Sequence, residues 1–100
     1  MGIKFDSKWE AERYGQLVAM ERAGIVRNLE RQVRYNILVN EQKICQYVAD
    51  FVYEQTKLDS DEYEQIVEDA KGVETPEFKL KKKLMKAVFN IEIKVSKKNG

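Results

Sequence analysis

Two carboxylates and a lysine stand out because they interrupt strand-like runs of apolar residues. Asp50 lies inside the run Tyr47–Tyr53, and Asp69 and Lys71 close a later run that begins at Ile66. Asp and Lys are depleted from strand interiors, and charges are seldom buried without a partner. Because alternate residues of a strand share a face, Asp69 and Lys71 are expected to point the same way. Two carboxylates beside a lysine can hold a divalent metal.

The chemistry that such a set favours is hydrolysis at a phosphate. Two close carboxylates repel each other unless one is protonated or a cation lies between them. Magnesium takes one or two carboxylates together with waters and substrate phosphate. Lys71 could orient or deprotonate an attacking water, or stabilise negative charge in the transition state. The alternative interpretation is a buried Asp–Lys ion pair, or strand ends that simply reach solvent.

The composition excludes several other classes of site. The 100 residues contain no histidine and one cysteine, Cys45. Zinc sites, Ser-His-Asp triads and Cys-His nucleophiles are therefore not expected, and a reducing, cytoplasmic setting fits the lone cysteine. A metal must be bound through oxygen, which favours magnesium, manganese or calcium. No apolar run approaches the ~20 residues of a membrane helix, so no membrane partner is expected.

Charge is distributed unevenly along the chain. Residues 1–73 hold 10 Lys and Arg against 14 Asp and Glu, whereas residues 74–100 hold 8 Lys against 3 Glu. An acidic centre beside a basic end suits a nuclease that binds metal and phosphate together. A solvated lysine-rich tail would have the same composition.

Hydrophobic periodicity predicts four strands. Alternation and apolar runs mark residues 31–39, 43–55, 62–71 and 91–95. The short connections between the first three predict an antiparallel meander. The second of these segments is apolar on both faces except at Asp50, which favours a central place in the sheet.

Two helices complete the predicted fold. One is expected over residues 7–23, where Ser7 and Glu10 form a capping box, and the other runs from Thr75 to about Phe89. The order α-β-β-β-α-β predicts a single domain over residues 1–100 with an α/β architecture, in which a four-stranded mixed sheet is flanked by the two helices.

Several other polar residues are candidates for the site. Glu10 completes the capping box, but it can face the site if its helix begins beside the sheet end. Gln32 lies on the polar face of the first strand, where an ordinary surface role is the alternative. Lys81 falls inside the apolar arc of the second helix, so it must reach solvent or meet a carboxylate or a DNA phosphate. The lysines that share one face of this helix, either solvated or in contact with phosphate, are Lys79, Lys82, Lys83 and Lys86.

Five segments, in this order, resemble the PD-(D/E)xK nuclease superfamily, and more closely a small family of phage-encoded endonucleases and Holliday-junction resolvases. The segments are Phe5–Ala11, Asn28–Gln32, Tyr47–Phe51, Val67–Gly72 and Phe78–Leu84. The resemblance extends over residues 3–95. Two departures leave the preferred metal ion open: Ala49 precedes Asp50 where the superfamily has its proline, and Asp69 replaces the commoner Glu.

The resemblance implies a restriction-endonuclease-like core and a magnesium-dependent DNA endonuclease, with manganese able to substitute. The implied substrate is branched or structured DNA during phage recombination, repair or packaging. Because one chain has one site, cutting two strands implies a homodimer or two successive nicks. The residues that the resemblance assigns are Glu10, Asp50, Asp69 and Lys71 for catalysis, the same three acids and the Ala70 carbonyl for the metal, and Gln32 and Lys81 as accessory groups.

Two other functions remain open. The chain could be a non-catalytic nucleic-acid-binding protein that uses only its lysine-rich helix. It could also be an accessory subunit that acts within a larger phage DNA-processing complex.

Overall fold

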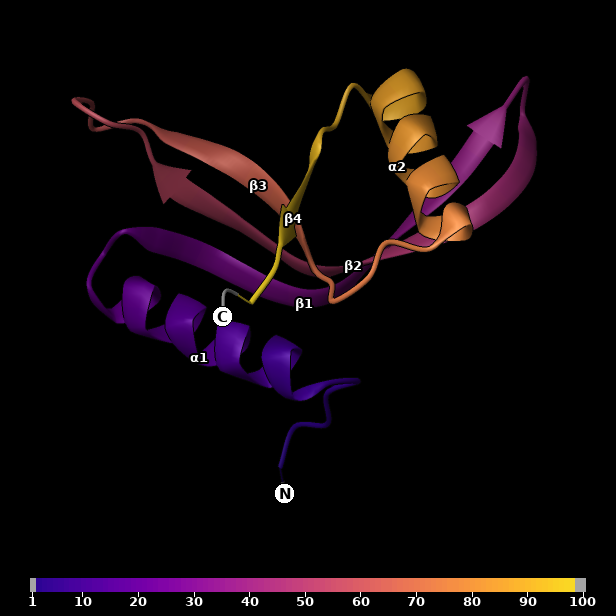
Figure 1. The fold of residues 1–100 in the computed structure, drawn as a ribbon. Helices are drawn as coiled ribbons and strands as arrows, with labels where there is room; N and C mark the ends of the chain where they lie inside the picture. The colour runs from indigo at the N-terminus through magenta and orange to yellow at the C-terminus, as the bar shows by residue number, and fades with distance from the viewer. Residues whose placement is uncertain (1, 99–100) are drawn as a thin grey trace.

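Six elements follow one another in the predicted α-β-β-β-α-β order (Figure 1). The computed structural model describes residues 2–98. The elements are α1 (Lys8–Arg22), β1 (Val26–Val39), β2 (Gln42–Thr56), β3 (Tyr63–Ala70), α2 (Pro76–Phe89) and β4 (Ile93–Ser96). None of the helices within these residues is long and apolar enough to cross a bilayer.

The four strands form one mixed sheet in the order β1-β2-β3-β4. The first three pair antiparallel, and β4 pairs parallel to β3 after the crossover through α2. The predicted mixed sheet with two flanking helices is therefore confirmed. β2 has a neighbour on each side, which explains why it is apolar on both faces.

The pairing of β2 with β3 stops before the pairing of β1 with β2 does. The last β2–β3 pair is Phe51 with Glu68, and the next residues in register are Asp50 and Asp69, a position called here the ladder end. Beyond it, β1 and β2 continue as a two-stranded ribbon to the turn that joins them. Figure 1 shows this ribbon extending beneath α2, while α1 lies along the opposite side of the sheet.

Each helix buries its apolar side against the sheet in a separate cluster. Val52 of β2 belongs to the α2 cluster, whereas its neighbour Phe51 belongs to the α1 cluster, so at this point the helices cover opposite faces. The buried members of the α2 cluster are Ile37, Tyr47, Ala49, Val52, Val67, Phe78, Met85 and Ile93. Those of the α1 cluster are Leu17, Val26, Phe51, Tyr53 and Ala70.

The helix starts are the ones that the sequence predicts. The Ser7 hydroxyl accepts a hydrogen bond from the Glu10 N–H (3.1 Å), and the Thr75 hydroxyl accepts one from the Phe78 N–H (3.1 Å). Pro76 occupies the first turn of α2, where its missing N–H has no cost.

β2 and β3 keep their predicted bounds to within one residue, whereas the other two strands differ by more. β1 begins at Val26 rather than at residue 31, because a register shift between Arg27 and Glu30 interrupts the alternation on which the prediction depends. The last strand covers Ile93–Ser96 rather than 91–95, because the Ile91 N–H still bonds to the end of α2 (3.2 Å to the Met85 carbonyl).

The β1–β2 turn gives a stability prediction. Asn40 and Glu41 both have positive φ (+50° and +66°), as a two-residue hairpin turn requires, and this conformation suits glycine better than glutamate. Glu41→Gly is therefore expected to stabilise the fold by about 0.5–1 kcal/mol in urea denaturation. The opposite change at Gly24 (φ +80°), Gly24→Ala, should destabilise it by about 1 kcal/mol. Loss of stability in Glu41→Gly would contradict the turn conformation.

Candidate active site

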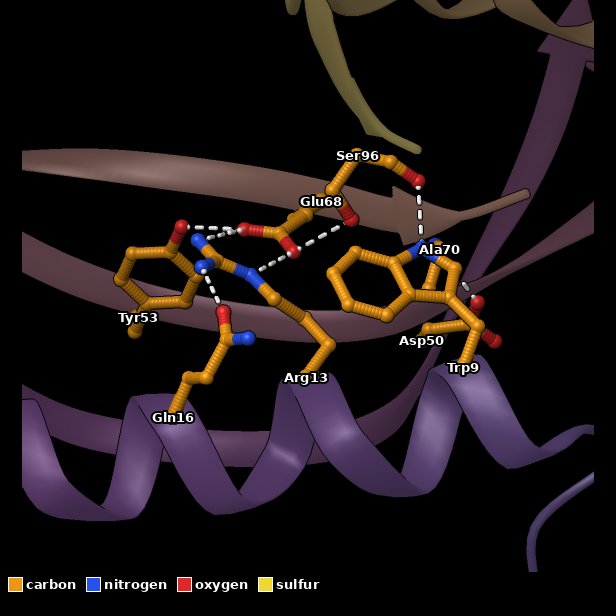
Figure 2. A network of polar contacts seen from close by, with 8 residues as sticks. All are labelled: Trp9, Arg13, Gln16, Asp50, Tyr53, Glu68, Ala70 and Ser96. Carbon is orange, nitrogen blue, oxygen red and sulfur yellow. Dashed lines mark hydrogen bonds and ion pairs between the residues drawn. The ribbon is translucent and has the colours of Figure 1, made fainter. Parts of the chain in front are cut away.

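The ladder end brings Asp50 and Asp69 face to face. Asp50 is 8% exposed and Asp69 is 1% exposed. The Asp50 Oδ2 atom accepts a hydrogen bond from the Ala70 N–H (2.9 Å), as Figure 2 shows. A side chain thus provides the partner for a backbone donor where the strand pairing stops. The two carboxylates therefore meet, as the hairpin pairing of β2 and β3 allows, but at the point where that pairing stops rather than at an end of the whole sheet.

The proximity of Asp69 changes the acidity of Asp50. Burial, and then the adjacent Asp69, raise the pKa of Asp50 from its ordinary 3.8 to about 7, although the Ala70 N–H favours the charged form. The charge on Glu10 also raises it. Near neutral pH the pair therefore holds less than its full negative charge unless a cation lies beside it.

Asp69 has one satisfied oxygen and one that lacks a donor. The Tyr47 hydroxyl donates a hydrogen bond to Asp69 Oδ2. Lys71 Nζ lies 3.2 Å from Oδ1, an ion-pair distance, but without hydrogen-bond geometry. Among residues 2–98, Oδ1 is one of two buried side-chain polar atoms without a hydrogen-bond partner, the other being Nε of Arg31. The Lys71 ammonium already gives this oxygen one positive charge, and a buried carboxylate oxygen outside the hydrogen-bond network can also bind an ion.

Lys71 follows the last residue of β3 and lies on the same side as Asp69, as the alternation predicts. Its ammonium also lies 4.9 Å from the centre of the Phe78 ring, a cation–π contact. The side chain is half-buried. The ring and the carboxylate together hold the ammonium close to Asp69.

Glu10 is buried, with 3% of its surface exposed. Its Oε2 atom lies 3.4 Å from Gln32 Nε2 and 3.7 Å from a guanidinium nitrogen of Arg31. Burial, and then the charge on Asp6, raise the pKa of Glu10, Arg31 lowers it, and Asp69 raises it slightly. The carboxylate therefore turns toward β1 and lies within electrostatic reach of Asp69. A capping role alone does not explain this burial.

Gln32 lies opposite Asp50 in the β1–β2 register, since Arg31 pairs with Phe51 and Val33 with Ala49. Its φ is +53°, a left-handed conformation that costs a non-glycine residue about 1–2 kcal/mol. Such strain tends to accumulate at functional sites. The predicted accessory residue thus lies between Glu10 and the ladder end.

A pocket of about 290 Å³ opens beside Asp69 and Lys71. Lys81 also lines it, but its ammonium pairs with Glu77 on the same helix (3.1 Å) rather than with a carboxylate of the ladder end. The full lining is Gln46, Tyr47, Val48, Asp69, Lys71, Thr75, Glu77, Phe78 and Lys81. The pocket therefore brings Lys71 and Lys81 together with one of the three predicted acids, Asp69, whereas Glu10 and Asp50 are not among its lining residues.

The lysine face of α2, defined as Lys79, Lys82, Lys83 and Lys86, lines a separate pocket of about 470 Å³. Lys82 pairs with Glu74 and Lys86 with Glu92, each at 3.3 Å. Within residues 2–98, Lys79 and Lys83 form no ion pair. These two lysines are the members of the face that have charge available for an external anion.

Tyr47 is a site residue that the sequence did not predict. In the apolar run around Asp50 it has the pattern of a core residue, and its ring does pack in the α2 cluster. Burial and the neighbouring Asp69 raise the pKa of its hydroxyl, so it stays a proton donor. The only signal for this role in the sequence is the residue type, because a tyrosine carries a hydroxyl at the tip of its apolar ring.

The residues at the ladder end are compatible with a hard divalent cation. Within the described residues, no three His, Cys, Asp or Glu side chains gather closely enough to form a complete metal site. Asp50 and Asp69 nevertheless provide two carboxylates, the number that magnesium takes from many proteins, and Asp69 Oδ1 lacks a donor. Ala70 contacts the pair through its N–H, which donates to Asp50. That the Ala70 carbonyl is a metal ligand stays a prediction.

The chain matches one family model, over residues 1–98, and the family is described as "Protein of unknown function (DUF1064)". No curated protein and no solved structure matches it.

The raised pKa of Asp50 makes stability depend on pH. The folded protein keeps a proton that the unfolded chain releases above pH ~4, so metal-free stability should fall between about pH 4 and the folded pKa of about 7. Asp50→Asn cannot lose a proton and can still accept from Ala70. It should therefore be more stable than the wild type at pH 8, by on the order of 1–3 kcal/mol. At pH 4 this difference in the free energy of unfolding should be much smaller.

Urea denaturation at the two pH values, without divalent metal, measures this difference. Asp61→Asn, in the exposed β2–β3 loop, is the matched control and should change stability equally at both. If Asp50→Asn changed the free energy of unfolding by the same amount at pH 4 and pH 8, the raised pKa of Asp50 would be contradicted.

Proposed function

The chain belongs to the DUF1064 family, and we propose that it is a metal-dependent DNA endonuclease that hydrolyses phosphodiester bonds. The observation that carries the proposal is the buried Asp50–Asp69 pair, with the Lys71 ammonium in an ion pair with Asp69 Oδ1 at 3.2 Å. A buried acid such as Asp50, whose ionisation a neighbouring carboxylate opposes, destabilises a fold at neutral pH, so a functional reason for the pair is favoured.

Magnesium is the proposed cofactor, with manganese as a substitute. Asp50 and Asp69 would hold it. The family resemblance also implies Glu10 and the Ala70 carbonyl as ligands, but the Glu10 carboxylate turns toward β1 and does not gather with the other two acids of the described residues. When bound, the metal would polarise the scissile phosphate and make an attacking water more acidic. All three acids are buried, which keeps competing water away from them.

Lys71 is the proposed catalytic lysine. Its ammonium is held beside Asp69 and borders the 290 Å³ pocket, so it can donate to a phosphate oxygen or to the attacking water there. A fixed positive charge in a half-buried position stabilises a transition state that gains negative charge. Gln32, as an accessory group, would orient the Glu10 carboxylate through its amide.

The proposed substrate is branched or structured DNA, as in phage recombination, repair or packaging. The lysine face of α2 supplies a surface for the phosphate backbone, and Lys81 lies on the same helix at the edge of the Asp69 pocket. Such contacts position a duplex without reading its sequence. Cutting both strands would require a homodimer or two successive nicks.

The lysine face also favours a second candidate, a nucleic-acid-binding protein without catalysis, alone or as a subunit of a larger phage complex. This candidate needs Lys79 and Lys83 but gives no role to Asp50, Asp69 and Lys71. Catalysis and binding can therefore be separated by substitutions at the ladder end.

A cleavage panel tests the proposal. Purified protein is incubated with four-way junction, flap, single-stranded and duplex DNA, with magnesium or manganese. The wild type should cleave branched DNA, and Asp69→Asn and Lys71→Met should lower kcat by about 100-fold or more with DNA binding retained. Lys57→Met, which alters a lysine paired with Glu62 in the β2–β3 loop (3.7 Å), should leave kcat unchanged.

Manganese binding, measured by calorimetry without DNA, provides a second readout for the wild type and Asp69→Asn. No metal-dependent cleavage of any substrate by the wild type would exclude the enzyme and leave the binding protein. Equal cleavage of all four substrates would remove the preference for branched DNA but keep the nuclease.

The lysine face predicts how binding depends on salt. Each phosphate contact contributes about one unit to the slope of log Kd against log salt concentration. Lys83→Ala should weaken the binding of different DNA sequences to a similar extent and reduce that slope by about 1, measured by fluorescence anisotropy. Lys57→Ala is the control with the same change of charge, and an equal effect of both variants would show that only net charge matters.

A further inference from the structure

A second buried carboxylate, Glu68, lies next to Asp69 on β3 but faces α1. It is 0% exposed, and its carboxylate accepts hydrogen bonds from other side chains. Arg13 donates through Nε (2.6 Å) and through a second guanidinium nitrogen (3.0 Å), and the Tyr53 hydroxyl donates as well (Figure 2). Burial alone would raise the pKa of Glu68, but these bonds outweigh it and lower the pKa. The proposed chemistry does not use this network.

Ser96, the last residue of β4, connects this network to both parts of the candidate site. Its hydroxyl donates to Glu68 (2.7 Å). Its carbonyl accepts two hydrogen bonds, one from the Lys71 backbone N–H (3.0 Å) and one from the Trp9 indole N–H (2.9 Å). Figure 2 shows the indole of Trp9, in the first turn of α1, directed at this carbonyl. Trp9 immediately precedes Glu10 in the chain.

One carbonyl oxygen therefore ties together the two segments that supply Glu10 and Lys71. Buried ion pairs such as Arg13–Glu68 add little net stability compared with apolar residues, but they impose a strict geometry. Here that geometry fixes Ser96, and through Ser96 the end of β3 and the start of α1.

We infer that Trp9 and Ser96 are positioning residues, which hold the Glu10 turn and Lys71 at a fixed separation through the Ser96 carbonyl. Neither side chain enters the 290 Å³ pocket. The expected effect on the cleavage rate rests on the proposed function. The connection of Trp9 to the Lys71 backbone through the Ser96 carbonyl does not. A misplacement of about 1 Å in such a site can cost about 100-fold in rate.

The test compares two substitutions that each remove one hydrogen bond from an aromatic side chain to a carbonyl. Trp9→Phe keeps an aromatic ring but loses the bond to Ser96. Tyr63→Phe loses the bond to the Gly24 carbonyl (3.0 Å), which ties β3 to the region just after the far end of α1. Both weaken the attachment of α1, but only the first is at the site.

Trp9→Phe should lower kcat by about 10-fold or more with KM for DNA within about twofold of the wild type. In the metal-free protein, the Lys71 amide should exchange its hydrogen at least about 10-fold faster by NMR, because its acceptor loses a restraint. Ser96→Ala removes only the hydroxyl bond to Glu68 and should produce the same changes to a smaller degree. Tyr63→Phe should change neither kcat nor the exchange of Lys71.

Hydrogen exchange separates this inference from the proposed function. If the wild type cleaves no DNA but Lys71 exchanges faster in Trp9→Phe alone, the proposed function fails and the positioning link stands. Unchanged Lys71 exchange in both Trp9→Phe and Ser96→Ala overturns the link, whether or not the protein is a nuclease. Equal losses of kcat in Trp9→Phe and Tyr63→Phe also overturn it, since they would reflect stability alone.

Discussion

The hydrogen bond from the Ala70 N–H to Asp50 is the interaction on which the arrangement of the chain depends. A strand that leaves its neighbour exposes backbone groups that need partners. Here the Asp50 carboxylate accepts the hydrogen bond from the Ala70 N–H. β3 can therefore end and lead into α2, while β2 continues to pair with β1. The same bond places Asp50 against Asp69, and the Lys71 ammonium, 3.2 Å from Asp69 Oδ1, partly offsets the repulsion between the two like charges. The same hydrogen bond therefore allows β3 to end and brings the two carboxylates of the candidate site together.

Neighbouring acids on β3 illustrate how a sheet gives similar side chains different environments. Glu68 faces α1, where Arg13, Tyr53 and Ser96 donate to it, and its pKa is lowered. Asp69 faces the other way and keeps an oxygen without a donor, while its partner Asp50 has a raised pKa. Environments that shift the pKa values of nearby carboxylates in opposite directions are typical of sites in which structural and chemical roles have separated.

The sequence predicted the elements because their signals are local: the caps at Ser7 and Thr75, and the alternation along the strands. The charged residues on β2 and β3 were also visible as exceptions to strand composition. The departures have a different origin. The register shift between Arg27 and Glu30 interrupts the alternation from which β1 was predicted, and the positive φ of Gln32 leaves no signal in the residue pattern. The Trp9–Ser96 bond joins residues 87 positions apart, which no local pattern encodes.

The parallel pairing of β4 with β3 has a consequence for the order of assembly. β4 is the last of the six elements to be synthesised, and its Ser96 contacts both the first turn of α1 and the residue that follows β3. Contacts so distant along the chain form late, because their loop-closure entropy has to be overcome first. The Ser96 carbonyl therefore reaches the Lys71 N–H and the Trp9 indole only once β4 has paired with β3.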